Sequence, residues 1–159
     1  MERSITGFHQ DEEGDWIAEL ACGHSQHVRH NPPFQLQAWV VDTESRRGRI
    51  GQLLECPLCD RSEMPERLKF VRSSPEWDSQ TMPAGLRRAH RLAEGTWGRI
   101  VVRSGRMRFT ARSAPPTDTV LIDTVLDESS AQPIPPAVEH EVEPLGQVVF
   151  HIDFLEVTR

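Results

Sequence analysis

The chain consists mainly of short apolar runs separated by polar turns, and helical periodicity is almost absent. Residues 5–10 and 16–20 have the pattern of two strands, and the polar turn 11–15 between them predicts a β-hairpin. Residues 38–41, Ala-Trp-Val-Val, are a third strand candidate, followed by a polar, Gly-containing connection over 46–51. This first part holds too few apolar residues for a secure core, so we expect a metal to stabilise it.

Residues 64–159 show a stronger strand pattern. Residues 106–112 alternate the apolar Met107, Phe109 and Ala111 with polar side chains, which is the period of a half-buried strand. This strand is expected to be joined to another one, 97–103, across Ser104-Gly105. Further strands are expected at 68–72, 118–125 and 147–154, with a turn that feeds a strand over 131–142. Many short strands with Gly/Pro turns favour a sandwich or barrel.

Length and charge narrow the function classes. A chain of 159 residues holds one or two domains, and no apolar run approaches the roughly 20 residues of a membrane span. The net charge of −6 argues against a nucleic-acid binder that uses a broad basic face. Free cysteines without an export signal predict a reducing, cytoplasmic location.

Charges are unevenly distributed in the second part. Residues 87–112 hold eight arginines and one acid, whereas residues 118–156 hold nine acids and no lysine or arginine. The arginines either form a patch for an anionic ligand or pair with the acids across neighbouring strands. We favour pairing across the sheet.

The three cysteines lie in two clusters with metal-ligand spacing. Cys56 and Cys59 form a C-x-x-C pair, and Cys22 begins a segment that also contains His24, His27 and His30. Tetrahedral Zn²⁺ takes four S or N donors, so three cysteines and one histidine predict a structural Cys3His site. His24 forms a compact C-x-H hook, His27 needs a longer loop, and His30 is the least favoured; the choice of histidine is open.

Two other uses of the cysteines are less favoured. A redox C-x-x-C usually begins a helix after a strand in a βαβ pattern, and no such pattern follows Cys59. A disulfide framework is disfavoured by the odd count of three cysteines and the lack of a signal peptide.

A second candidate site lies in the strand-rich part. His90, His140 and His151 belong to separate predicted strands, and three imidazoles are able to hold a second divalent metal with open positions. The alternative is an apolar ligand pocket lined by His90 and His140 together with Trp97, or histidines with a purely structural role. The H-x-H pair that metal-binding cupins normally show is absent, because position 92 is leucine.

Both parts resemble known families. Residues 4–61 resemble a small uncharacterised bacterial family labelled after pressure-regulated open reading frames. The resemblance rests on Gly7–Trp16, on Cys22-Gly23-His24 with the following His27–Pro33, and on Cys56–Asp60. Residues 65–159 resemble the cupin-like domain named after tellurite-resistance protein B. The motifs are Arg72–Trp77, Met82–Leu86, Gly95–Ile100 and Ile134–Gly146.

The resemblance implies a mainly β fusion, with a small zinc-binding β domain over 1–62 and a cupin, or double-stranded β-helix, over 63–159. It does not imply methyl transfer, because tellurite detoxification in that protein belongs to a methyltransferase domain for which this chain has neither the glycine-rich turn nor the length.

Three functions are consistent with these features. The first is a binding module with structural Zn²⁺ and a cupin pocket for a small molecule or oxyanion, in a stress response. The second is a metalloenzyme that uses His90 and His140. The third is a zinc-knuckle adaptor for a protein partner. A homodimer is expected by analogy with other cupins only, and neither a membrane nor nucleic acid is an expected partner.

Overall fold

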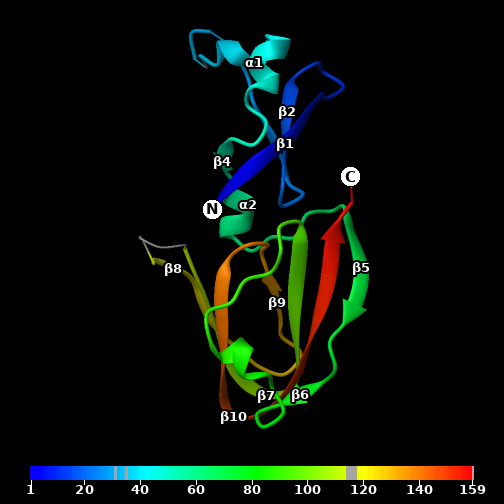
Figure 1. The fold of residues 1–159 in the computed structure, drawn as a ribbon, viewed down its shortest axis with the longest axis vertical. Helices are drawn as coiled ribbons and strands as arrows, with labels where there is room; N and C mark the ends of the chain where they lie inside the picture. The colour runs from blue at the N-terminus through cyan, green and yellow to red at the C-terminus, as the bar shows by residue number, and fades with distance from the viewer. Residues whose placement is uncertain (31, 35, 114–117, 159) are drawn as a thin grey trace.

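Two antiparallel sheets make up the chain. The computed structural model describes residues 1–30, 32–34, 36–113 and 118–158 and shows the two sheets stacked along the long axis of the molecule (Figure 1). The first sheet has the strand order β3-β2-β1-β4, and the second has the order β5-β10-β7-β8 with β6 paired to β10 and β9 paired to β7. Among the described residues, no helix is long and apolar enough to cross a membrane.

The N-terminal unit extends from β1 to α2. Its elements are β1 (Glu2–Gln10), β2 (Trp16–Leu20), β3 (Ser25–His27), the 3-10 helix η1 (Ala38–Val40), α1 (Thr43–Arg47), β4 (Leu53–Glu55) and α2 (Pro57–Asp60). The predicted hairpin is confirmed, since β1 and β2 pair from Gln10↔Trp16 to Ile5↔Leu20. Strand β1 also pairs with β4, so it lies at the centre of this sheet.

The strand predicted at residues 38–41 is wrong. Ala38–Val40 forms a 3-10 turn that leads directly into α1. The Asp42 side chain caps this helix by accepting a hydrogen bond from the Ser45 backbone N–H at 2.7 Å. The buried Arg46 side chain then donates to the carbonyl of Val40 at 2.6 Å and holds the turn against the helix. Local capping therefore overrides the strand propensity of Trp-Val-Val.

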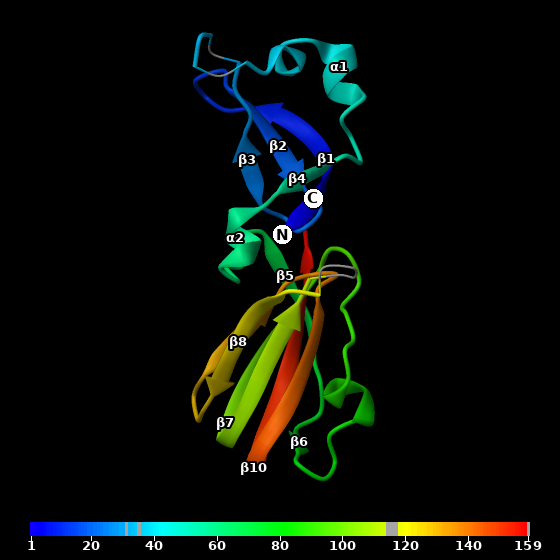
Figure 2. The same ribbon diagram turned by 90° about the vertical axis from the view of Figure 1, so that its left-hand side faces the viewer.

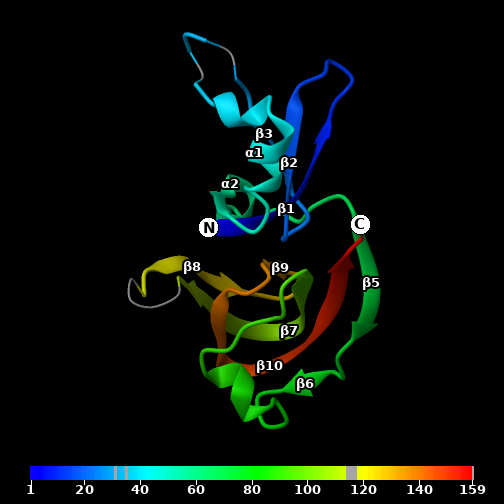
Figure 3. The same ribbon diagram turned by 45° about the horizontal axis from the view of Figure 1, so that its top comes forward.

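The β-roll extends from β5 to β10. Its elements are β5 (Leu68–Ser73), β6 (Trp77–Asp78), the 3-10 helix η2 (Ala84–Arg87), β7 (Thr96–Arg112), β8 (Val120–Leu126), β9 (Ala131–Ile134) and β10 (Glu139–Val157). Figures 2 and 3 show its sheet curling from β8 through β7 and β10 to β5. The expectation of a mainly β fold, with a barrel-like arrangement of strands in the second part, is confirmed.

Two long strands form the centre of the roll. The sequence predicts a break at Ser104-Gly105, but β7 continues through it, and β10 likewise joins the two strands expected around 139–142 and 147–154. The β7–β10 pairing runs from Glu139↔Arg112 to Glu156↔Thr96, with register shifts near Gly146. The register shifts accommodate Gly105 and Gly146, so these glycines bend the strands without ending them.

Two apolar clusters hold the molecule together. The larger one fills the β-roll and includes Ile100, Phe109 and Phe150, all fully buried. The smaller one belongs to the N-terminal unit and surrounds the cysteines, but it also contains Trp97 from β7, which is 0% exposed. The β-roll thus supplies part of the core that the N-terminal unit lacks.

The arginines and acids of the β-roll pair as expected across the sheet. The Arg99 guanidinium lies 2.8 Å from the Asp153 carboxylate, and Arg108 forms a two-pronged contact with Asp123 at 2.7 and 2.6 Å. Arg91 pairs with Glu139 on the neighbouring segment. These pairs confirm the interpretation that the opposite charge blocks belong to facing strands.

Candidate metal centre

The first cysteine sits in a tight turn at the end of β2. The backbone N–H of Gly23 donates to the carbonyl of Leu20 at 2.8 Å, and the Leu20 N–H donates to the carbonyl of His24 at 2.9 Å. Gly23 has a φ of +87°, a conformation that glycine adopts without steric cost. This turn brings the Cys22 and His24 side chains to the same side of the chain.

The other two cysteines lie at the start of α2. Cys56 is the residue that precedes the helix, and Pro57 occupies its first turn, where the missing N–H is tolerated. Cys59 follows within the same helical turn and is fully buried. The C-x-x-C pair therefore presents two sulfurs from one turn of chain, which is the usual arrangement of a zinc knuckle.

The two turns bring four donor atoms together. The ligating atoms of Cys22, His24, Cys56 and Cys59 all lie within 4.8 Å of one another, and all four side chains are buried. The His24 Nδ1 lies 3.4 Å from the Cys22 Sγ, 3.3 Å from the Cys56 Sγ and 3.6 Å from the Cys59 Sγ. The Cys22 and Cys56 sulfurs are 3.9 Å apart.

These separations fit a tetrahedral metal ion. With Zn–S bonds of about 2.3 Å and Zn–N bonds of about 2.0 Å, a tetrahedron places its sulfurs about 3.8 Å apart and its nitrogen about 3.5 Å from each sulfur. The three distances from the His24 nitrogen and the distance between the Cys22 and Cys56 sulfurs lie within about 0.2 Å of these values. Three soft sulfur donors and one imidazole nitrogen are also the donor types that Zn²⁺ prefers.

The electrostatics of the cluster also favour a cation. Burial alone lowers the pKa of His24, but hydrogen bonds that its protonated ring donates to the Cys56 and Cys59 sulfurs overcome this effect and raise the pKa to about 9. The hydrogen bond from the Cys22 thiol, followed by that from Cys59, lowers the pKa of Cys56, while the pKa of Cys22 is raised because it shares its proton with Cys56. Thiolates crowded together in this way attract a positive charge, which either protons or a metal ion can supply.

The structure does not bring the other two histidine candidates to the cluster. His27 lies on the edge strand β3, where its side chain is about half exposed and its Nε2 contacts the Asp11 carboxylate at 2.9 Å. His30 follows β3, and its donor atoms are not among the four that gather around the cysteines. The compact C-x-H hook therefore supplies the nitrogen of the cluster.

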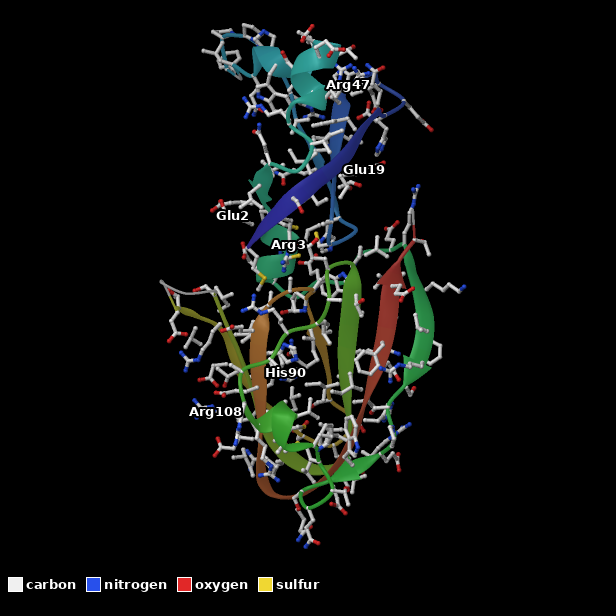
Figure 4. The ribbon with its side chains drawn as sticks, in the orientation of Figure 1. Glu2, Arg3, Glu19, Arg47, His90 and Arg108 are labelled. Carbon is white, nitrogen blue, oxygen red and sulfur yellow. The ribbon has the colours of Figure 1, made fainter. Side chains whose placement is uncertain are left out.

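The β-roll brings His90 and His140 together. Their backbones form an isolated antiparallel β-bridge, in which each N–H donates to the other residue's carbonyl, and their ring centroids lie 4.1 Å apart. Each Nδ1 contacts the carbonyl two residues earlier, that of Arg88 at 3.2 Å and that of Val138 at 2.9 Å. Figure 4 shows His90 over the interior of the β-roll. Burial lowers the pKa of His140 to about 4, and the neighbouring His90 adds a smaller lowering.

The remaining predicted residues of the second site lie elsewhere. Side chains alternate along β10, so His151 and Asp153 lie on the face opposite to Phe150 and Ile152. There the His151 ring contacts the Asp153 carboxylate at 3.3 Å. Trp97 sits at the start of β7, where its indole N–H donates to the carbonyl of Cys22 at 2.8 Å. Within the described residues, the only group of three or more metal-donor side chains is the Cys/His cluster.

Two further residues contact the metal centre, and the sequence pattern does not place either of them there: Arg3 is not identified at all, and Trp97 is expected at the second site. The Arg3 Nε lies 3.3 Å from the Cys59 Sγ, and Arg3 is 8% exposed. Trp97 contacts the His24 ring with centroids 5.7 Å apart. A sequence signal existed for Arg3, since an arginine two residues before Ile5 shares the buried face of a strand. No comparable signal marks Trp97, which is about 75 residues from Cys22 in sequence.

A groove of about 870 Å³ runs along the boundary between the N-terminal unit and the β-roll. His24 is one of its lining residues, so the metal centre lies next to this groove. The groove is also lined by five carboxylates and one arginine, namely Glu19, Glu63, Glu66, Glu94, Glu156 and Arg67. Its charge therefore favours the approach of cations.

Comparison with known proteins gives two family matches. Residues 6–63 match a family described as a protein of unknown function, DUF3565, and residues 72–152 match the TehB-like domain. The resemblance of both parts is thereby confirmed. No curated protein matches the sequence.

Several solved structures are also similar to this chain. A protein from E. coli strain K12 is 24% identical with a TM-score of 0.55, and the match covers 61% of this chain and 98% of that one. TehB from Haemophilus influenzae is 21% identical with a TM-score of 0.52, and the match covers 58% of this chain and 32% of that one. This chain thus spans about a third of the length of that TehB. The Cnp3 cupin domain of Schizosaccharomyces pombe is a more distant likeness, 11% identical over 99% of this chain and 88% of that one, with a TM-score of 0.37.

The TehB-like match concerns the β-roll, whereas the four residues of the Cys/His cluster lie within the segment 6–63 that matches DUF3565. Through residues 72–152, the chain belongs to the TehB-like domain family, and it carries a DUF3565 segment at its N-terminal side.

Proposed function

We propose that the chain is a zinc-binding protein in which Cys22, His24, Cys56 and Cys59 hold one structural Zn²⁺. The observation that carries this proposal is the set of four buried donor atoms within 4.8 Å of one another, spaced as a tetrahedral ion requires. A catalytic zinc usually has three protein ligands and an open position for water. Here the protein supplies all four donors, which favours a structural role.

The location of the cluster supports the same role. The two turns come from segments more than 30 residues apart in sequence, and the N-terminal unit has a small apolar core of its own. An ion that joins the two turns stabilises the folded state relative to the open chain. The acidic groove beside His24 provides a favourable path for the ion to enter.

Metal content per chain tests the proposal and also tests the choice of histidine. Purified wild type is expected to hold one equivalent of zinc by elemental mass spectrometry. His24→Ala is expected to lose it, because the nitrogen donor disappears. His27→Ala is the matched control, since His27 is exposed and bonded to Asp11, and it should retain the full equivalent.

Cobalt substitution checks the donor set independently. Co²⁺ in the wild-type site should show the intense visible bands of a tetrahedral thiolate site, and Cys59→Ser should weaken its sulfur-to-metal absorption. Wild type without bound metal, or zinc retained in full by His24→Ala, contradicts the proposal.

A second role is proposed for the His90–His140 pair. Because a carbonyl accepts hydrogen bonds, the Nδ1 of His140 carries the proton and its Nε2 is an acceptor. This Nε2 is buried without a partner, which favours binding of a small ligand that brings a hydrogen-bond donor. Arg99 and Arg103, which belong to the arginine-rich segment 87–112, already pair with Asp153 and Glu76.

A protonated oxyanion is one ligand that meets this requirement, and the TehB-like match makes tellurite the first probe. Tellurite added at neutral pH should shift the imidazole ¹⁵N signals of His140, and sulfate, which carries no proton there, should not. An equal response to both ions, or none to tellurite, contradicts this role.

A further inference from the structure

We infer that Arg3 is a positioning residue of the metal centre, which stabilises the Cys59 thiolate and raises the affinity for the metal. The inference rests on the proposed function, because it concerns the thiolates that would bind the ion. No family match assigns a role to Arg3, which lies outside the matched residues 6–63 and 72–152.

The first argument is the position of Arg3 on β1. This strand pairs with β2, which leads to Cys22, and with β4, which leads to Cys56. Arg3 itself faces Leu54 in the register with β4. Figure 4 shows Arg3 on β1, close to the boundary with the β-roll. A side chain on the central strand is thus held between both halves of the metal centre.

The second argument is the lack of any other anionic partner. The Arg3 side chain donates to two sulfur atoms, from its Nε to the Cys59 Sγ at 3.3 Å and from its Nη2 to the Met1 Sδ at 3.4 Å. No aspartate or glutamate in the described part of the chain forms an ion pair with it. A guanidinium keeps its charge in proteins, and a buried charge without an opposite charge is costly. The Cys59 sulfur, which would be a thiolate when it binds the metal ion, is therefore placed to be its counter-ion.

The third argument is the charge of the loaded site. Three thiolates, a neutral imidazole and a divalent ion have a net charge of −1. Arg3 brings this charge to zero inside a site whose ligands are all buried. The hydrogen bond to sulfur also orients the Cys59 side chain and withdraws electron density from it, which makes the bound thiolate less nucleophilic.

Three arginine variants test the inference. Arg3→Met removes the charge and the N–H donors but keeps an unbranched apolar side chain, and Arg3→Lys keeps the charge. The matched control is Arg46→Met, because Arg46 is also buried in the N-terminal unit but contacts Val40 and Trp16 in place of the cysteines. Zinc affinity is measured by competition with a chelator.

We expect Arg3→Met to weaken zinc binding about 10- to 100-fold, the usual effect of removing a group that supports a metal ligand. Arg3→Lys should lose less affinity, and Arg46→Met should stay close to wild type. Arg3→Met with wild-type affinity overturns the inference, as does an equal loss in Arg46→Met, which would indicate general destabilisation.

Alkylation of the zinc-loaded protein gives a readout that a merely structural role would not change. With excess zinc and N-ethylmaleimide, Arg3→Met should increase the share of modification at Cys59 relative to Cys22 and Cys56, as measured by peptide mass spectrometry. An unchanged distribution among the three cysteines overturns the inference. If wild type holds no zinc, the proposed function itself fails and the role of Arg3 fails with it. If wild type does bind zinc, a negative result in the Arg3 variants contradicts the role of Arg3 alone.

Discussion

At the scale of single residues, His140 is the histidine whose burial has the clearest consequence for stability. It is 2% exposed and packs against His90 and Phe109. Burial lowers its pKa from 6.5 to about 4, so the folded protein keeps it neutral where the unfolded chain already binds a proton. Its stabilising effect is complete above pH 6.5 and is lost as the pH falls toward 4.

The size of this effect follows from the shift. A difference of about 2.5 pKa units corresponds to roughly 3 kcal/mol of unfolding free energy, all of it lost by pH 4. We expect His140→Asn, which keeps an N–H for the Val138 carbonyl, to remove this dependence. Urea unfolding at pH 7 and pH 4.5 should therefore show a larger loss for wild type than for the variant. If the difference in unfolding free energy between wild type and His140→Asn is the same at both pH values, the prediction is contradicted.

The residues of the metal centre were predictable to different degrees. The spacing of Cys22, Cys56 and Cys59 predicts a metal site, because C-x-x-C places two sulfurs on one turn. Spacing leaves three histidines open, and only the Gly23 turn places His24 beside the sulfurs. The contributions of Arg3 and Trp97 depend on which strands become neighbours. This is decided by packing between residues far apart in sequence, which local patterns do not reveal.

At the scale of elements, Gly105 shows why β7 continues where a break was expected. Its φ is +78°, and a Cβ at this position would lie 2.0 Å from the Gln147 carbonyl oxygen on β10. The two backbones meet so closely that only glycine fits. The sequence Ser-Gly resembles a turn because the same property of glycine serves tight turns and close strand contacts alike.

We therefore expect Gly105→Ala to destabilise the β-roll strongly. Gly146→Ala is the matched control, because Gly146 also has a positive φ, +104°, but nothing lies within 4 Å of its added Cβ. The control should cost about 1–2 kcal/mol for the left-handed conformation alone. Gly105→Ala should cost more, since backbone must move. Equal midpoints of urea unfolding for the two variants would show that the close approach is not a constraint.

The elements were otherwise predictable where one face of a strand is buried. Alternation at 106–112 and the polar turn at 11–15 identify β7 and the first hairpin. The segment 38–41 failed because the Asp42 cap and the Arg46 side chain determine its conformation from outside it. The second half of β10 could be predicted as a strand, but its continuity with residues 139–142 depends on pairing with β7.

At the scale of the whole molecule, the metal centre is joined directly to the β-roll. Trp97 donates to the Cys22 carbonyl from the start of β7, and Val157 at the end of β10 packs against Gly23 so closely that a Cβ there would lie 2.9 Å away. Strands β7 and β10 are neighbours, so both contacts reach the same end of the β-roll. Ordering of the Cys22 turn by a metal must therefore stabilise that end of the roll as well.

This coupling predicts which parts of the protein become less stable when the proposed zinc ion is removed. A chelator should increase hydrogen exchange in residues 1–62 and also in Thr96–Val101 and Asp153–Val157, which lie against the metal centre. Exchange in the paired strands of β7 and β8, at Met107–Arg112 and Val120–Leu126, should stay unchanged because these residues pair with each other within the roll. Trp97→Phe removes the hydrogen bond to Cys22 and should weaken the response at Thr96–Val101. A response confined to residues 1–62 would mean that the two parts are stabilised independently, and a uniform response would mean that the molecule opens as one unit.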